Sequence, residues 1–205
     1  MARPTTSRVS IDLAKETGLY RRQLIIRQAA LLFFEKGYPA ATMDDIASRL
    51  QVTKPVVYTH FASKADLLFA VCQGGMNELH FAIDRLSKLE IGPSEKLRRV
   101  VEAAAQTLME KQPETAVFAR ESKHLLPSQV DAIHRSQKSF DAKLALILDE
   151  GVQAGAFDIT DIGVTTLAIT GMLSWMFSWY GRQRRLSDDQ ICRAFADLAI
   201  RMVER

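Results

Sequence analysis

The chain has 205 residues, of which 47% are hydrophobic and 25% are charged, and its formal net charge is +3. This balance is that of a globular protein with a sizeable core, and it excludes a disordered or collagen-like chain. Cys72 and Cys192 lie far apart without a CxxC or metal-ligand spacing, which excludes a disulfide framework and suits a reducing cytoplasm. The N-terminal residues contain no apolar run of signal-peptide length, so we expect a cytoplasmic protein.

Charge is unevenly distributed along the chain. Residues 1–64 contain 10 Lys or Arg against 5 Asp or Glu, a formal charge of +5, whereas residues 65–205 carry −2. The asymmetry predicts an anionic partner at the N-terminal end, with a solvated surface face as the alternative. We expect residues 1–18 to form a basic flexible arm, in which Arg3, Arg8 and Lys15, together with Arg21 and Arg22 just after it, add contacts to this anionic partner. For Arg3 and Arg8 an inert tail is the alternative.

Helical periodicity dominates the sequence, and no alternating strand pattern occurs, which predicts an all-α fold of about nine helices. The first helix has an apolar face formed by Ile25, Ala29, Leu32 and Phe33. Gly37 stands where a glycine in left-handed conformation commonly ends a helix. The pattern therefore predicts both this helix and its end.

Two short helices are expected next. The first begins with a capping-box-like start at Thr42, with Asp45 three residues later, and its inner face is formed by Ile46, Ala47 and Leu50. The following turn lies at about residues 51–52. In helix-turn-helix proteins, the helix that follows such a turn lies in the major groove of DNA.

The second short helix has side chains suited to DNA. It starts at Thr53, and a proline at the next position but one is tolerated in a first helical turn. Its exposed side chains mix hydrogen-bond donors with methyl groups, as base edges and phosphates require. These side chains are Lys54, Val56, Thr59 and His60.

Longer helices are expected in the rest of the chain. Ser63 caps a fourth helix that runs to about Leu89, and Gly74 and Gly75 within it cost about 2 kcal/mol relative to two alanines. That cost predicts either a joint or a close helix contact. In the helix at 128–153 a heptad-like apolar stripe is interrupted by one polar residue, Gln137. The expected later helices are residues 94–111, 114–125, 128–153, 162–180 and 187–204.

The N-terminal pattern resembles the N-terminal domain of the TetR family of bacterial transcriptional regulators over about residues 21–68. Gln51 departs from the family pattern, which has glycine in this turn. The resemblance implies a helix-turn-helix DNA-binding domain at 19–65 and an effector-binding and dimerisation domain at 66–205. The matching residues are Ile25, Ala29, Leu32, Phe33, Gly37, Tyr38, Thr42, Ile46, Ala47, Val52, Thr53, Tyr58, His60, Phe61, Ser63 and Lys64.

The resemblance also implies a homodimer on a palindromic double-stranded DNA operator, with half-sites on the order of 34 Å apart or somewhat more. Packing against the first helix is the alternative role for Tyr58, and Val57 and Phe61 are assigned to the core. Carried over position by position, the base-contact candidates are Lys54, Pro55, Val56 and Thr59, with Thr53 at the helix start. The phosphate-contact candidates are Thr42, Tyr58, His60 and Lys64.

No charged residue occurs from residue 162 to 181, an apolar length that raises the question of a membrane span. Five Thr or Ser residues lie within it and Asp161 directly precedes it, so we expect no span. A helix that is apolar all round is buried all round, and a second subunit is a natural cover. The resemblance implies a four-helix bundle made of the last two helices of each subunit, so we expect a homodimer through residues 162–204.

The C-terminal domain of the TetR family binds an effector that changes the separation of the recognition helices. Trp175 and Trp179, followed by Arg182, resemble the subgroup that responds to acyl-coenzyme A thioesters, since aromatic faces suit an adenine and guanidinium groups suit phosphates. The expected tunnel residues are Phe118, Leu144, Leu148, Met172 and Phe177, with Arg120 and His124 at the polar end.

Other roles for these residues stay open. Trp and Met stripes at helical spacing are often core, and an arginine cluster after a helix often only complements the helix dipole. An aromatic or drug-like apolar effector is one alternative, and a DNA binder without an effector is another. We expect a repressor that releases its operator on effector binding, with an activator as the alternative.

The sequence contains no constellation for catalysis. GxSxG, Walker and GxGxxG motifs are absent, so we expect neither an enzyme nor a cofactor. The four histidines lack metal-ligand spacing, so no metal site is expected. His124 and His134 meeting a glutamate at a metal is the remaining alternative.

Overall fold

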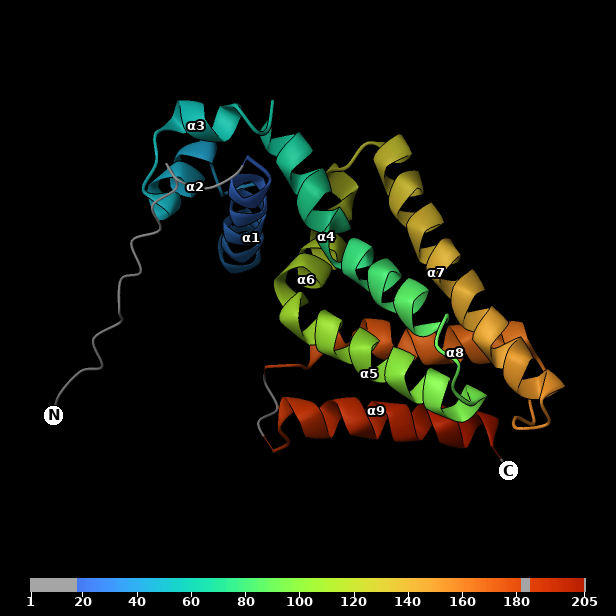
Figure 1. Ribbon diagram of the computed structural model, residues 1–205. Coiled ribbons are helices and arrows are strands. Elements are labelled where there is room, and N and C mark those ends of the chain that lie inside the picture. Colours follow the sequence, from blue (N-terminus) through green and yellow to red (C-terminus); the bar gives the residue numbers. More distant parts are fainter. Residues whose placement is uncertain (1–17, 182–184, 205) are drawn as a thin grey trace, which may run out of the picture.

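The computed structural model describes residues 18–181 and 185–204, and in these ranges the chain is all-α without a β-strand, as expected (Figure 1). Most of the predicted arm at 1–18 lies outside the described residues, and so does Arg182. The helices are α1 Gly18–Lys36, α2 Met43–Leu50, α3 Lys54–Tyr58, α4 Lys64–Leu86, α5 Pro93–Glu110, α6 Gln112–Glu121, α7 Pro127–Gln153, α8 Ile162–Ser174 and α9 Asp188–Val203. Two 3₁₀ turns, η1 Ser122–His124 and η2 Trp175–Ser178, follow α6 and α8.

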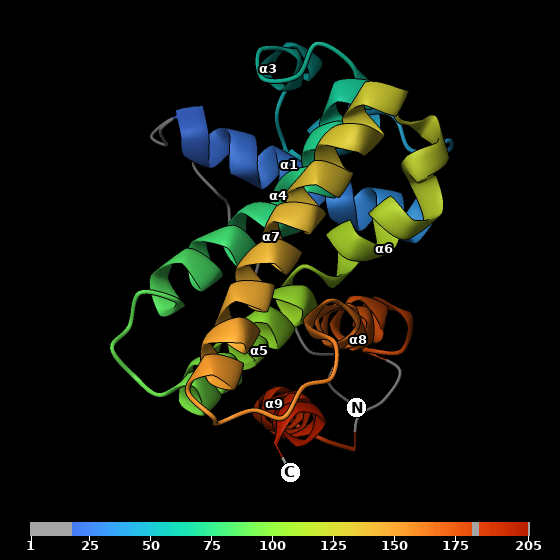
Figure 2. The same ribbon diagram turned by 90° about the vertical axis from the view of Figure 1, so that its right-hand side faces the viewer.

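The helices form two hydrophobic cores joined along α4. α1–α3 lie together at one end of the molecule, whereas α5, α8 and α9 lie at the other, and α4 runs between them (Figures 1 and 2). The N-terminal core also includes Val117 of α6, Leu125 after η1 and Ile133 of α7. The C-terminal helices therefore pack directly on the N-terminal unit, and a boundary at residue 65 falls within this continuous packing.

Local side-chain signals set the ends of the N-terminal helices. Gly37 ends α1 with φ 79°, and its N–H donates to the Phe33 carbonyl at 2.9 Å. Thr42 and Asp45 form the expected capping box of α2. Ser63 caps α4 by accepting from the Asp66 N–H. These three starts and stops were all predicted, because each depends on residues within a few positions of one another.

Gln51 ends α2 in the left-handed conformation, with φ 57° and ψ 38°. It is the one described residue other than glycine with a positive φ. A side chain with a Cβ is strained there by about 1–2 kcal/mol. Gln51 thus adopts the left-handed conformation that glycine would adopt in this turn, and the turn keeps its shape at a cost in conformational energy.

α4 is continuous through Gly74 and Gly75 and ends at Leu86, three residues before the predicted end. A Cβ on Gly74 would lie 3.8 Å from Glu114 Cγ, and one on Gly75 would lie 3.7 Å from Lys111 Cβ. Both distances are ordinary van der Waals contacts, so neither glycine is required by close helix packing. A joint at this pair remains a prediction.

The sequence predicted one α-helix over 162–180, and this prediction was wrong in its second part. α8 ends at Ser174 and continues as the 3₁₀ turn η2 to Ser178. Thr166, Thr170 and Ser174 each donate to the backbone carbonyl four residues earlier, at 2.7, 3.1 and 2.7 Å. Such bonds compete with the helical ladder and disturb it, and a final 3₁₀ turn is a common outcome.

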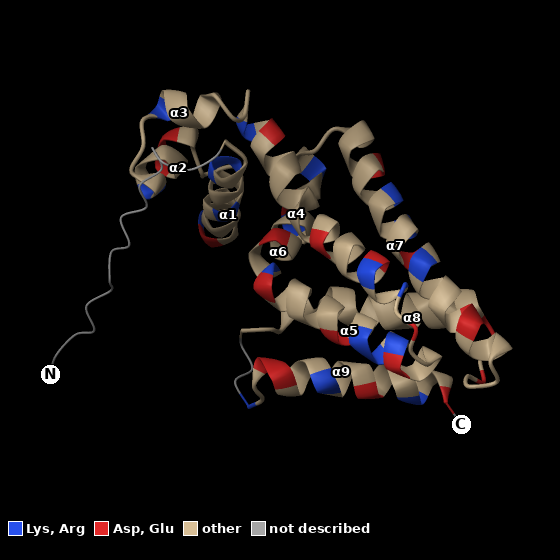
Figure 3. Ribbon diagram, in the orientation of Figure 1, with Lys and Arg blue, Asp and Glu red and all other residues tan. Residues whose placement is uncertain are grey.

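α8 and α9 leave an apolar face exposed. α8 carries no charged side chain and is tan throughout in Figure 3. Figure 2 shows α8 and α9 side by side, nearly end-on, far from α3. Among the described residues, no helix is both long enough and apolar enough to cross a lipid bilayer. The exposed apolar side chains are Val164, Leu167, Trp175, Leu198 and Met202.

Candidate nucleic-acid interface and internal cavity

The side chains of α3 predicted to contact DNA lie on an exposed surface. Thr53, Lys54, Pro55 and Thr59 are exposed, whereas Val56 and His60 are partly buried. Tyr58 is 43% exposed, so its side chain is accessible, and a phosphate contact by Tyr58 remains a prediction, with packing against α1 as the alternative. Val57 and Phe61 are buried, as predicted. α3 therefore has one face in the core and one face free for a ligand.

Lys54 already has an acidic neighbour. Its ammonium lies 2.8 Å from Asp44 Oδ2 of α2, and this hydrogen bond raises the pKa of Lys54. Both side chains are exposed, so the pair contributes little to stability. A phosphate or a base would compete with Asp44 for the ammonium, which makes Lys54 available for a contact at small cost.

Thr42 has a local structural role. Its hydroxyl oxygen accepts from the Asp45 N–H at 3.1 Å, and its own N–H donates to Asp45 Oδ2 at 2.9 Å. The first turn of α2 also contains Asp44, so two carboxylates stand where a phosphate would bind. A phosphate contact by Thr42 remains a prediction, and the capping box competes with it.

Lys64 is engaged within the protein. Its ammonium donates to the carbonyls of Tyr38 and Ala41, both at 2.9 Å, and lies 4.3 Å from the centre of the Tyr38 ring. A further contact to the Pro39 carbonyl is 3.4 Å long. These bonds fix the loop between α1 and α2 against the start of α4. The structure thus assigns Lys64 to the loop and weakens the case for a phosphate contact.

Arg120 and His124 do not line a tunnel, contrary to our expectation. The Arg120 guanidinium lies 5.0 Å from the centre of the Phe34 ring of α1. The His124 ring lies 5.1 Å from that of Tyr38. Because α6 ends at Glu121 against the N-terminal unit, its last residues face α1 and the following loop. Both residues therefore belong to the junction between the two cores.

Glu121 adds a polar link at the same junction. Its carboxylate accepts from the Tyr38 N–H at 3.3 Å and lies 3.5 Å from the His124 ring. His134 instead contacts the Phe118 ring, with 6.4 Å between ring centres. Within the described ranges, no three His, Cys, Asp or Glu side chains are grouped to hold a metal ion.

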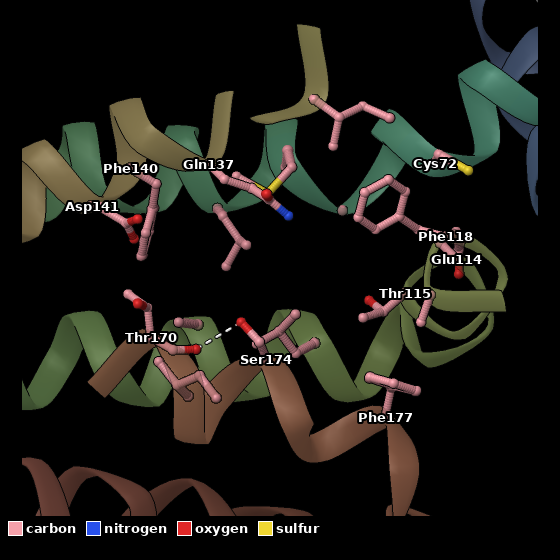
Figure 4. A pocket seen from close by; sticks show the side chains of 18 residues that line it. Cys72, Glu114, Thr115, Phe118, Gln137, Phe140, Asp141, Thr170, Ser174 and Phe177 are labelled. Atoms are coloured by element: carbon pink, nitrogen blue, oxygen red, sulfur yellow. Dashed lines mark hydrogen bonds between the residues drawn. The ribbon is translucent and has the colours of Figure 1, made fainter. Parts of the chain in front are cut away.

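A cavity of about 360 Å³ lies between α4, α5, α6, α7 and α8. Its volume is in the range of small-molecule sites. Figure 4 shows Cys72 and Phe118 at one end of it and Asp141 and Thr170 at the other. Burial raises the pKa of the Cys72 thiol to about 12, which disfavours the nucleophilic thiolate form. The lining is Cys72, Gly75, Met76, Leu79, Ala104, Leu108, Glu114, Thr115, Phe118, Ala119, Ile133, Gln137, Phe140, Asp141, Thr170, Leu173, Ser174 and Phe177.

Two of the predicted tunnel residues, Phe118 and Phe177, line this cavity. The structure does not bring the others to it. Leu144 and Leu148 are fully buried in the C-terminal core, and Met172 packs against the same core. Helical periodicity placed Leu144 and Leu148 on the inner face of α7 correctly, but this part of the face packs into the C-terminal core and does not line the cavity.

The two tryptophans are also away from the cavity. Trp179 stacks on Phe195 of α9, with ring centres 6.0 Å apart. Trp175, the first residue of η2, is 65% exposed, and its ring contacts Phe177. An aromatic site for an adenine at Trp175 would therefore lie on the surface at η2, outside the cavity.

Sequence reasoning missed the two carboxyl groups of the cavity. Glu114 is buried, and burial raises its pKa, whereas nearby Lys111 and Arg27 lower it. Burial also raises the pKa of Asp141, and the Thr170 hydroxyl opposes that rise. Gln137, the polar interruption of the apolar stripe, lies one turn before Asp141 and was the available signal.

Family models match most of the chain. The model described as bacterial regulatory proteins, tetR family, matches residues 25–71. The model described as tetracyclin repressor-like, C-terminal domain, matches residues 90–203. Together they span the α3 surface and most of the cavity wall.

Individual proteins are similar over nearly the same length. The transcriptional activator FasR of Mycolicibacterium smegmatis is 29% identical over 160 residues, 76% of this chain and 72% of that protein. The structure of the TetR family regulator PfmR from Thermus thermophilus is 31% identical with a TM-score of 0.79, over 88% of this chain and 99% of that one. AibR in complex with isovaleryl coenzyme A and operator DNA is 25% identical with a TM-score of 0.73, over 87% and 97%.

Proposed function

Because the chain belongs to the TetR family of bacterial transcriptional regulators, we propose that it is a homodimeric repressor that releases a palindromic operator when a small apolar effector enters its cavity. Such a regulator acts on DNA in the cytoplasm. The observation that best supports this function is α6, which contributes cavity residues on one side and packs on α1 and α4 on the other. A ligand that moves α6 would therefore act directly on the DNA-binding unit.

The α3 surface supports the DNA-binding part of the proposal. Lys54 is the side chain best placed for a base or phosphate contact, because Asp44 is its only close partner among the described residues and both side chains are exposed. Lys54→Ala should weaken operator binding by about tenfold or more, since a good base contact contributes about 1–3 kcal/mol. Lys64→Ala should instead destabilise the loop at residues 38–41 and leave the salt dependence of binding unchanged.

The exposed apolar face of α8 and α9 supports a second copy of this chain as its cover. Val164 and Leu167 of α8, Trp175 of η2, and Leu198 and Met202 of α9 are all exposed, and α8 and α9 are the last two helices of the described chain and contact each other. Large apolar side chains exposed on neighbouring helices are typical of a subunit interface. Leu167→Arg should therefore produce monomers in analytical ultracentrifugation, and those monomers should bind the operator weakly.

Acyl thioesters are the first effector class to test. The cavity is apolar over most of its wall, as an acyl chain requires, and a protein of related sequence, AibR, was crystallised with isovaleryl coenzyme A. The coenzyme head group would lie outside the cavity, near the exposed Trp175. An aromatic or drug-like molecule is the second candidate, because Phe118, Phe140 and Phe177 offer ring contacts.

The test is release of operator DNA in a fluorescence anisotropy titration with acyl-coenzyme A thioesters of short, medium and long chains. Leu108→Trp, which fills the cavity, should abolish release without weakening DNA binding. Leu146→Trp makes the same change at an exposed position of α7 and should leave release intact. Release that survives Leu108→Trp would place the effector elsewhere, and a promoter fusion that loses expression on effector binding would indicate an activator.

A further inference from the structure

The polar groups at one end of the cavity come from two facing helices. Gln137 and Asp141 are one turn apart on α7, and Thr170 and Ser174 are one turn apart on α8. Figure 4 shows Asp141 beside Thr170 at this end, with the aromatic rings of Phe118 and Phe177 toward the other. A ligand with an apolar body would place its polar group between α7 and α8.

The hydrogen-bonding capacity of this end is limited. The Ser174 hydroxyl donates to the Thr170 carbonyl at 2.7 Å, and the Thr170 hydroxyl donates to the Thr166 carbonyl at 3.1 Å. A hydroxyl has one proton, so the Ser174 hydroxyl offers only oxygen lone pairs to a ligand, whereas the Thr170 hydroxyl is also close enough to Asp141 to lower the pKa of that carboxyl group. The Gln137 carboxamide, directed into the cavity in Figure 4, can both donate and accept. The end is therefore rich in acceptors.

No positive charge balances Asp141 at this end. The described residues that line the cavity include no Lys, Arg or His. Burial raises the pKa of Asp141, and the group that opposes this rise is the Thr170 hydroxyl, which carries no charge. Burial also raises the pKa of Glu114, but there the basic side chains of Lys111 and Arg27 oppose the rise. A carboxylate that entered between α7 and α8 would meet a second carboxyl group, that of the partly buried Asp141, without a basic side chain to balance the two, which is unfavourable.

We propose that Asp141 is a specificity residue, which makes the cavity accept an effector whose polar group is uncharged and carries a hydrogen-bond donor, and reject the corresponding free carboxylate. A hydroxyl, or an amide next to a thioester, meets this condition. Asp141 accepts from the donor, and Gln137 donates to the carbonyl or hydroxyl oxygen. The inference rests on the proposed function, because it concerns the effector of the same cavity.

The test uses the full-length protein and four probes with the same eight-carbon chain: octanol, S-octanoyl-N-acetylcysteamine, octanoate and octylammonium. Isothermal titration calorimetry at neutral pH measures their affinities for the wild type and for Asp141→Asn. The control is Asp131→Asn, the same change at an exposed position of α7 that does not line the cavity. Glu114→Gln removes the other carboxyl group.

The wild type and Asp131→Asn should bind octanol and the thioester at least about tenfold more tightly than octanoate, a difference of about 1.4 kcal/mol. Asp141→Asn should bind octanoate about tenfold more tightly than the wild type does, with octanol affinity changed by less than about threefold. Equal binding of octanoate and octanol by the wild type would overturn the proposal. The proposal would also be overturned if Glu114→Gln, and not Asp141→Asn, reduced the preference for octanol over octanoate.

The remaining outcomes separate this inference from the proposed function. If octylammonium binds more than about tenfold more tightly than octanol, the carboxyl groups pair with a cation and the uncharged class is wrong. If all four probes bind alike, the cavity still takes an apolar effector, and only the selection by Asp141 fails. If none of the probes binds, both the inference and the apolar effector fail.

Discussion

The helix-turn-helix region and the cavity region both consist of amphipathic helices, but their helix ends are fixed differently. α2 and α4 begin with side-chain caps from Thr42 and Ser63, and α1 ends at Gly37. α5 and α6 begin after Gly92 and Lys111 without a side-chain cap. Their positions depend on packing between residues distant in sequence, such as α5 against α9. The ends of α1, α2 and α4 are therefore fixed locally, whereas α5 and α6 are positioned by steric fit; α8, which also lines the cavity, has a local cap from Asp161.

Gly151→Ala tests the steric fit and should have the largest effect. A Cβ at this position of α7 would lie 1.9 Å from Cδ2 of the buried Phe157, so the ring would have to leave its site. Overpacking of this kind costs about 1–3 kcal/mol, and loss of the Phe157 site places the result at the upper end. Urea denaturation measures the change in the free energy of unfolding.

Gly74→Ala is the matched control in α4. Its Cβ would find Glu114 Cγ at 3.8 Å, an ordinary contact, and helix propensity favours alanine by about 1 kcal/mol. The control should therefore be neutral or stabilising. Equal destabilisation by both changes would mean that the fit around Phe157 has no special role.

Thr42→Ala tests the local specification of the first region. It removes the capping box of α2 and should cost about 1 kcal/mol. Thr53→Ala is the internal comparison, because Thr53 precedes α3 but makes no side-chain cap hydrogen bond, so stability should hardly change. Thermal denaturation of the two variants decides the point, and an equal loss from both would show that the cap of α2 is not the cause.

Gln51→Gly should give a smaller effect of opposite sign. Glycine relieves the left-handed strain of about 1–2 kcal/mol at φ 57° and loses about 0.5–1 kcal/mol through the entropy of the unfolded chain. We expect a net stabilisation of about 0.5 kcal/mol, measured as a shift of the urea midpoint. Gln51→Ala keeps the Cβ and should not be stabilising, so stabilisation by both would assign the effect to the lost side chain.

The sequence predicted the local features well. The end of α1, the capping box of α2 and the start of α4 each depend on a few adjacent residues, and the structure confirms them. The end of α8 at Ser174 was missed, because the Thr and Ser side chains that bond back to the helix carry no strong stop signal in sequence.

The cavity could not be predicted in the same way. Periodicity identifies the inner face of each helix but not where two inner faces fail to meet. Leu144 is fully buried in the core, whereas Asp141, less than one turn before it, lines the cavity. Gln137 was the one visible sign that the inner face of α7 changes character.

Glu114→Gln should have the smallest effect, and one that depends on pH. Because burial raises the pKa of Glu114, the folded protein holds its proton to a higher pH than the unfolded chain does. Stability is therefore lost as pH rises from the unfolded pKa, about 4.3, to the raised folded pKa, and is unaffected below both. The free energy of unfolding of the variant, relative to that of the wild type, should therefore be higher at about pH 7.5 than at about pH 4.

Urea denaturation at both pH values measures this gain, with Glu90→Gln as the control at an exposed position. Between the two pH values, the free energy of unfolding should change by the same amount in the control variant as in the wild type. Lys111 and Arg27 lower the pKa of Glu114 and so limit the gain. A gain of the same size at acid pH would show that the carboxamide packs better than the carboxyl group, and that the proton on Glu114 plays no part in the stability of the cavity region.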